Sequence, residues 1–219
     1  MSSFESNYND IIENIKKLTN KKVEILVVSK YATCDQILQA YKQGIRHFGE
    51  SRFQDAIKKI NILNKNDINW HFIGHIQKNK AKKIITYFNT LQSIDSIELL
   101  NKVQNEANKI NKKINIYLQI NIANEQQKYG FNPDNFLNES PNPIDYPNIM
   151  INGIMVMLPK QKNKEKLKMY CQKASQIYQQ IKEKIPTIKT FSMGMSQDYK
   201  ICILYNSNQI RLGSALFKE

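Results

Sequence analysis

The sequence predicts an α/β protein that forms a single (β/α)8 barrel of the TIM type with an extra N-terminal helix. Two observations lead to this prediction. Apolar runs of strand length alternate with segments of helical spacing, roughly eight times along the chain. Most residues with reactive or phosphate-binding groups fall where the apolar runs end, and barrels build their sites at that end of the strands. A doubly wound open sheet shares the alternation and is the alternative.

The length fits one domain. The 219 residues are enough for one well-filled core, although ~250 is more typical of such a barrel. We expect a single domain over residues 1–219, with a helix at 7–20 and the barrel at 23–217. In the helix, apolar residues recur at helical spacing: Tyr8, Ile11, Ile12, Ile15 and Leu18.

The first half of the barrel is a series of strand–helix pairs. Segment 23–30 is an apolar strand, and segment 34–44 has apolar residues at helical spacing before a terminal glycine. The pairing repeats in 46–50 with 52–63, in 70–75 with 78–88, and in 90–95 with 96–111, where Ser96 is the expected N-cap.

The second half of the barrel is less regular. Segment 113–121 alternates apolar and polar residues as a strand does, but the proline-bearing segment 131–147 predicts a loop with at most a short helix. The remaining predicted elements are a strand at 149–158, a helix at 164–185, a strand at 190–194, a helix at 197–205 and a strand at 209–217. No helix is expected after this last strand, so the N-terminal helix is expected to close the outer ring.

The composition argues against several classes of function. The formal net charge is +13, but the lysines fall on separate predicted helices among Asn and Gln, without interleaved aromatic residues. This pattern favours solvated helix faces over a specific nucleic-acid site. Three separated cysteines predict neither a zinc site nor a disulfide framework. The acidic, polar N-terminus and the lack of a long apolar run predict a cytoplasmic protein with no membrane partner.

Three strand ends together suggest a covalent cofactor site. Lys30 closes the first strand, where an amine is partly removed from water, and a neutral amine can attack an aldehyde. The segments 192–196 and 210–214 contain glycine and serine at two further strand ends, where backbone N–H groups can bind a phosphate. A small molecule that carries both an aldehyde and a phosphate is pyridoxal phosphate (PLP).

Several strings of residues resemble a known family. They are Phe48-Gly-Glu-Ser-Arg52, Trp70-His-Phe-Ile-Gly-His-Ile-Gln77, Phe191-Ser-Met-Gly-Met-Ser196 and Ile210-Arg-Leu-Gly-Ser-Ala215, together with Val28-Ser-Lys30. The chain resembles, in order from residue 23 to residue 217, the pyridoxal phosphate homeostasis proteins, single-domain relatives of alanine racemase. It departs from the family at Ser51, where an asparagine is usual, at Asn206, where a glycine is usual, and at the C-terminus, which lacks the usual Gly-x-Arg ending.

The resemblance implies a fold-type III PLP barrel and assigns roles to strand-end residues. It implies that Lys30 forms the internal aldimine and that Arg211 faces the pyridine nitrogen. It also implies that the phosphate is held by Ser192, Gly194, Gly213 and Ser214. Further candidates are Ser51, Met193 and Ser196, with His75 equally balanced between a cofactor contact and a hydrogen bond to neighbouring backbone. His47 and His71 are expected to be structural.

The resemblance also implies intracellular PLP homeostasis, meaning storage, buffering or delivery of the cofactor to PLP-dependent apoenzymes. A permanently charged Arg211 would leave the pyridine nitrogen unprotonated, which makes PLP a weak electron sink. Because no second domain with an opposing base is expected, we predict a carrier without strong catalysis. A small PLP-dependent racemase or lyase is the alternative, and a basic nucleic-acid-binding module is a weaker third hypothesis.

Overall fold

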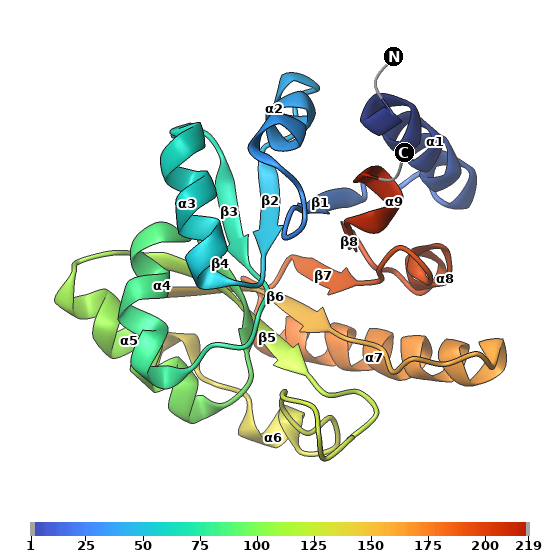
Figure 1. Cartoon of the computed structure of the whole chain (residues 1–219). Coiled ribbons are helices and arrows are strands. Elements are labelled where there is room, and N and C mark those ends of the chain that lie inside the picture. Colours follow the sequence, from blue (N-terminus) through green and yellow to red (C-terminus); the bar gives the residue numbers. More distant parts are fainter. Residues whose placement is uncertain (1–2, 218–219) are drawn as a thin grey trace.

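Parallel strands close into a barrel in the order of the sequence, β1 to β8, in the computed structural model, which describes residues 3–217 (Figure 1). The strands are β1 (Glu24–Val28), β2 (His47–Glu50), β3 (Asn69–Phe72), β4 (Thr90–Ile94), β5 (Ile114–Ile120), β6 (Ile149–Val156), β7 (Thr190–Met193) and β8 (Gln209–Leu212). β8 pairs with β1 in parallel, with Gln209 opposite Glu24. This pairing closes the sheet, confirms the predicted barrel and excludes the open sheet.

Helices form a ring outside the barrel (Figure 1). They are α1 (Ser3–Leu18), α2 (Cys34–Lys42), α3 (Phe53–Leu63), α4 (Ala81–Tyr87), α5 (Ile97–Lys109), α6 (Phe136–Glu139), α7 (Lys164–Lys184), α8 (Tyr199–Leu204) and α9 (Ser214–Phe217), with short 3₁₀ turns η1 (Lys78–Lys80) and η2 (Pro143–Asp145). Ser96 caps α5 as predicted, because its hydroxyl accepts a hydrogen bond from Leu99 N. The proline-bearing stretch after β5 holds only α6 and η2, which also agrees with the prediction.

The end of the barrel differs from the expectation. The predicted strand at 209–217 stops at Leu212, and α9 follows it although no helix was expected there. Gly213 makes the turn: a Cβ on this residue would lie 2.9 Å from the carbonyl oxygen of Val28, so only glycine fits against β1. The backbone N–H groups of Leu216 and Phe217 then donate to the Gly213 carbonyl, which starts the helix.

The N-terminal helix closes the outer ring, as expected, together with α9. It runs from Ser3 to Leu18 and so begins earlier than the predicted 7–20. The earlier start brings Phe4 into the core, with its ring 5.4 Å from the ring of Phe217 in α9. Figure 1 shows α1 and α9 lying beside each other next to α8.

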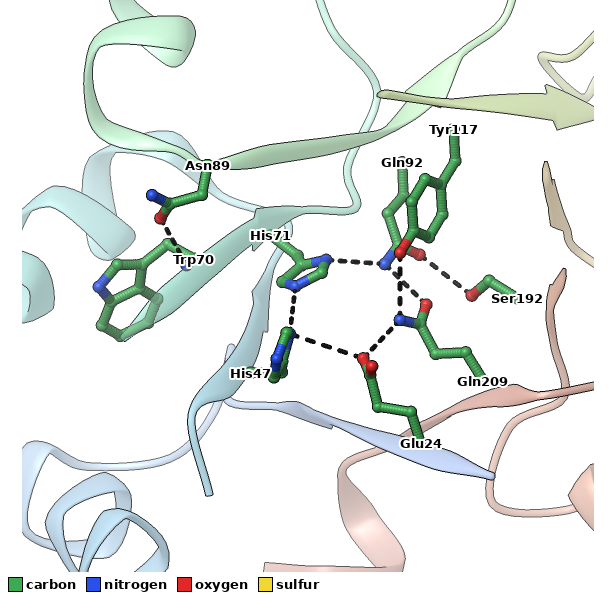
Figure 2. A network of polar contacts seen from close by, with 9 residues as sticks. All are labelled: Glu24, His47, Trp70, His71, Asn89, Gln92, Tyr117, Ser192 and Gln209. Carbon is green, nitrogen blue, oxygen red and sulfur yellow. Dashed lines mark hydrogen bonds and ion pairs between the residues drawn. The ribbon is translucent and has the colours of Figure 1, made fainter. Parts of the chain in front are cut away.

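The apolar core lies mainly between the sheet and the helices. Outward-facing strand residues such as Val27, Phe48 and Phe191 are fully buried in this layer. The barrel interior is polar instead. The side chains of His71, Gln92, Tyr117, Ser192 and Gln209 are buried there and hydrogen-bond to one another across the barrel (Figure 2).

Within residues 3–217, no helix combines the length and the apolar character needed to cross a lipid bilayer.

Candidate functional site

A cavity of about 950 Å³ opens at the carboxyl ends of the strands. Its walls come from loops that follow most of the strands, and both polar and apolar side chains line it. Of the residues singled out from the sequence, it brings together Lys30, Ser51, His75, Ser196, Arg211, Gly213 and Ser214. This is the edge at which parallel barrels place their ligands.

Lys30 lies in the loop after β1, with its side chain half-buried in the cavity wall. Its amine lies 5.1 Å from the centre of the Tyr31 ring, and within residues 3–217 no carboxylate is near enough to form an ion pair with it. Two other lysines line the cavity: Lys128, whose amine is held 2.7 Å from Glu125 Oε1, and Lys160, which is exposed and has no carboxylate partner within residues 3–217. The Lys30 amine therefore lies at the cavity without an ion pair to any carboxylate of residues 3–217.

A buried ion pair fixes the backbone just before Lys30. The Lys59 amine donates to the carbonyl oxygen of Ser29 at 2.6 Å and to Glu50 Oε1 at 2.9 Å. The Ser29 hydroxyl donates to the same carboxylate oxygen at 2.7 Å. Glu50 is fully buried, and its Oε2 accepts no hydrogen bond from residues 3–217. These contacts tie the ends of β1 and β2 to α3 and so set where Lys30 leaves the barrel.

Arg211, on β8, lies at the floor of the cavity and is almost fully buried. Its Nη1 donates to the carbonyl oxygen and to the hydroxyl of Ser192, both at 2.8 Å, and its Nη2 donates to Val156 O at 2.8 Å. Burial lowers the pKa of Arg211 to about 10, against opposing contributions from Cys202 and Asp198, so the guanidinium stays charged at neutral pH. Within residues 3–217, no hydrogen bond uses its Nε–H.

The ends of β7 and β8 form a small polar shelf at the cavity rim. The Ser214 hydroxyl donates to the Ser196 hydroxyl oxygen at 3.3 Å. Gly194 has φ +108°, a conformation that favours glycine, and its carbonyl accepts the backbone N–H of Arg211 at 2.9 Å. α9 begins at Ser214, and within residues 3–217 no backbone hydrogen bond uses the N–H groups of Ser214 and Ala215. Hydroxyls and N–H groups side by side suit an anion.

His75 lies on the opposite side of the cavity, in the loop beyond β3, because β3 ends at Phe72 rather than at the predicted residue 75. Its ring stacks on the ring of Tyr129, with centroids 3.6 Å apart, and its Nδ1 lies 3.4 Å from Asp95 Oδ2. The stacked rings of His75 and Tyr129 form an aromatic wall of the cavity. Ser51 also lines the cavity.

Three residues singled out from the sequence do not line the cavity. Ser192, Met193 and Gly194 are buried. The Ser192 hydroxyl points into the barrel, where it donates to Gln92 Oε1 at 3.1 Å and accepts from Arg211. Met193 packs in the apolar core. Ser192 and Gly194 therefore act on the cavity through Arg211, whose guanidinium and backbone N–H they contact.

Sequence reasoning missed two contributors to the site. Tyr129 stacks on His75. The sequence feature that could have pointed to it is an aromatic residue between Lys128 and Gly130, in a loop after a strand. Gln92 supports Arg211 through Ser192, and the sequence showed it only as a polar residue at the centre of the predicted strand at 90–95. Neither signal identifies the partner, because each partner comes from a distant part of the chain.

Comparison with known proteins places this geometry in a family. The family model for the alanine racemase N-terminal domain matches residues 4–219. A pyridoxal phosphate homeostasis protein of Haemophilus influenzae is 32% identical over 200 residues, which cover 89% of this chain and 84% of the relative. The one from Buchnera aphidicola subsp. Schizaphis graminum is 35% identical over 200 residues, covering 91% and 87%.

Solved structures agree with this placement. PipY of Synechococcus elongatus with PLP bound superposes with a TM-score of 0.84 at 27% identity, covering 95% of this chain and 98% of PipY. An alanine racemase of Clostridium difficile shares the fold, with a TM-score of 0.82 at 16% identity, and this chain covers 60% of it. The match in sequence, together with the shared fold, shows that the chain belongs to the pyridoxal phosphate homeostasis protein family.

Proposed function

We propose that this protein binds PLP at the carboxyl-end cavity and serves PLP homeostasis, by storing, buffering or delivering the cofactor. The observation that carries the proposal is the Lys30 amine, which has no carboxylate partner within residues 3–217 and shares one cavity with the charged, buried Arg211. Two relatives named pyridoxal phosphate homeostasis proteins, and the PLP-bound structure of PipY, support it.

The residues fit the parts of the cofactor. Lys30 would hold the aldehyde carbon, and the Nε–H of Arg211 would donate to the pyridine nitrogen. The rim residues Ser196, Gly213 and Ser214 would hold the phosphate with hydroxyl and N–H groups. The cavity of about 950 Å³ is large enough for a small ligand of this size. When bound, PLP supplies an electrophilic carbon and an electron-withdrawing ring.

The buried arginine argues against chemistry that needs a strongly activated cofactor. Strong carbanion chemistry needs an electron sink at the ring nitrogen, which a carboxylate promotes by keeping that nitrogen protonated. Arg211 has a pKa of about 10 and donates three hydrogen bonds to neighbouring oxygens, so at neutral pH it stays charged and can donate a hydrogen bond to the ring nitrogen but cannot accept one from it. The chain's own residues therefore hold the cofactor without activating it strongly.

Delivery to PLP-dependent apoenzymes is part of the proposal. The mouth of the cavity carries exposed apolar side chains, among them Tyr31, Tyr129, Met157 and Met195, beside the proposed aldehyde and phosphate positions. A bound cofactor there would lie near the protein surface, where another protein can receive it.

The test is covalent trapping. Purified protein loaded with PLP should show visible absorption, and borohydride should fix the cofactor to the peptide that contains Lys30. Lys30→Ala should lose both signals. Lys160→Ala is the matched control, because Lys160 also lines the cavity and also has no carboxylate partner within residues 3–217, yet it should trap PLP normally. Trapping on Lys160 or Lys128 would refute the assignment.

A further inference from the structure

A second polar cluster lies at the opposite, amino-end mouth of the barrel, and it plays no part in the proposed PLP site. Glu24 starts β1, His47 starts β2, and His71 is the third residue of β3. Figure 2 shows the three side chains converging from neighbouring strands. One oxygen or nitrogen atom from each of them lies within 4.8 Å of the others. We infer that Glu24, His47 and His71 bind a divalent transition-metal ion of the Zn²⁺ class.

The distances between the donor atoms suit such an ion. His47 Nδ1 lies 3.0 Å from His71 Nε2 and 3.5 Å from Glu24 Oε1. Ligands bound at 2.0–2.1 Å in a tetrahedral zinc site stand about 3.3 Å from one another. Two imidazoles and one carboxylate are a ligand set that Zn²⁺ commonly takes, with the fourth position left to water. Small side-chain movements would therefore complete the site.

Burial and charge also favour the ion. His71 is almost fully buried, and burial lowers its pKa to about 3, with the charge of His47 as a smaller cause. The ring is therefore neutral at physiological pH, which is the form that binds metal. His47 and Glu24 are each more than a third exposed, so an ion has a path from solvent, and the carboxylate offsets its charge.

Two carboxamides stand behind the ligands and can adapt to the ion. As drawn in Figure 2, Gln92 Nε2 lies 2.9 Å from His71 Nδ1, and Gln209 Nε2 lies 2.7 Å from Glu24 Oε1. A metal on His71 Nε2 moves the ring hydrogen to Nδ1, which then needs an acceptor. The two ends of a carboxamide have nearly the same shape, so Gln92 can turn its oxygen to this N–H and its NH₂ to the Ser192 hydroxyl.

Gln209 would turn with Gln92, because its oxygen now lies 2.9 Å from Gln92 Nε2. Its NH₂ would then donate to Gln92, and its oxygen would accept from the Tyr117 hydroxyl, which already lies 3.4 Å away. The turned Gln209 oxygen would stand where its NH₂ now contacts Glu24, so the Glu24 carboxylate would move away from it and onto the ion. Every buried polar atom of the cluster thus keeps a partner when the metal is bound.

The experiment is Zn²⁺ binding to the PLP-loaded protein, measured by competition with a chromophoric chelator of micromolar affinity. We expect one Zn²⁺ per chain and a rise in melting temperature with Zn²⁺. Glu24→Gln and His47→Ala should each weaken binding at least tenfold, since loss of even an outer-shell partner costs 10–100-fold. Glu24→Gln retains a side chain of the same shape, so it keeps the test valid if His47→Ala folds poorly.

His75→Ala and Cys34→Ala are the matched controls. Each removes another accessible metal-binding side chain, an imidazole at the far mouth and a thiol at the start of α2. Both should bind Zn²⁺ as the unchanged protein does. The inference is overturned if the unchanged protein takes no Zn²⁺ from the chelator, if Glu24→Gln and His47→Ala bind it undiminished, or if either control abolishes binding.

Discussion

Replacing Lys59 with methionine should destabilise the protein strongly, because the change leaves a charge buried alone. Glu50 has no exposed side-chain surface, and the side chain of Lys59 is only 13% exposed. The substitution removes the 2.9 Å ion pair and leaves the carboxylate with the Ser29 hydroxyl alone. Breaking a buried ion pair from one side costs about 3–5 kcal/mol. For a chain of this size, each kcal/mol lowers the melting temperature by roughly 2–4 °C.

Urea unfolding followed by circular dichroism measures the loss. Lys58→Met is the control, because Lys58 is an exposed lysine on the same helix without a carboxylate partner within residues 3–217, and it should change stability by less than about 0.5 kcal/mol. The double variant Lys59→Met/Glu50→Met should recover much of the loss, since replacing both charges with apolar groups removes the unpaired carboxylate. A loss below about 1 kcal/mol in Lys59→Met, or no recovery in the double variant, would refute the reasoning.

Three further outcomes are expected. Pyridoxal without its phosphate should bind far more weakly than PLP in equilibrium dialysis, since charged hydrogen bonds from the Ser196, Gly213 and Ser214 shelf contribute about 1.5–3 kcal/mol each; equal affinity would contradict the shelf. Because charged Arg211 would face the ring nitrogen, L-alanine incubated with the PLP-loaded protein in deuterated water should exchange little of its α-proton, and chiral chromatography should detect no D-alanine. A turnover of about 1 s⁻¹ or faster that depends on Lys30 would show that the protein is an enzyme. In EDTA, the free energy of unfolding should fall as the pH drops from about 6.5 towards 3. The folded-state pKa of His71 is depressed to about 3, so in this range only the unfolded chain takes up that proton. A pH series of urea unfolding curves measures the fall, which is at most about 1.4 kcal/mol per pH unit, and His71→Gln should reduce it.

The alternation of strands and helices could be predicted because it depends on local patterns. Each apolar run has the length of a strand, and the helices between them have their own periodic faces, so the α/β order follows from the sequence. The choice of a closed barrel over an open sheet depends on the pairing of β8 with β1, which joins the two ends of the chain. The predicted end at residue 217 failed for a physical reason. Residues 209–217 carry apolar side chains on both sides of the turn, and only the close approach of Gly213 to Val28 on β1 shows that the chain must bend there.

The candidate site was predictable in part. Lys30 and Arg211 lie at strand ends, and strand ends can be located from the pattern. Ser192 was expected to face the cofactor phosphate, but its side chain lies on the inward face of β7, below the cavity. A shift of one residue reverses the side of a strand on which a side chain lies, and predicted strand boundaries do not settle that direction.

The metal-ligand candidates illustrate the same limit. His47 and His71 were expected to be structural, and nothing in their spacing links them to Glu24. The three residues meet only because β1, β2 and β3 lie side by side at the amino-end mouth, with the register that pairs His47 with Asn69 and Val28 with Gly49. Closure of the barrel creates this cluster, and local sequence does not reveal it.

The polar interior limits how this barrel can change in evolution. A chain of hydrogen bonds runs through the interior from Arg211 through Ser192, Gln92 and His71 to His47. Whether each group donates or accepts depends on the group next to it in the chain. A single replacement within the chain leaves two partners unmatched, whereas the apolar layer outside tolerates exchanges of similar volume one at a time. Interior residues should therefore be replaced in compensating sets, and related sequences should show correlated substitutions at these positions while the outer layer drifts independently.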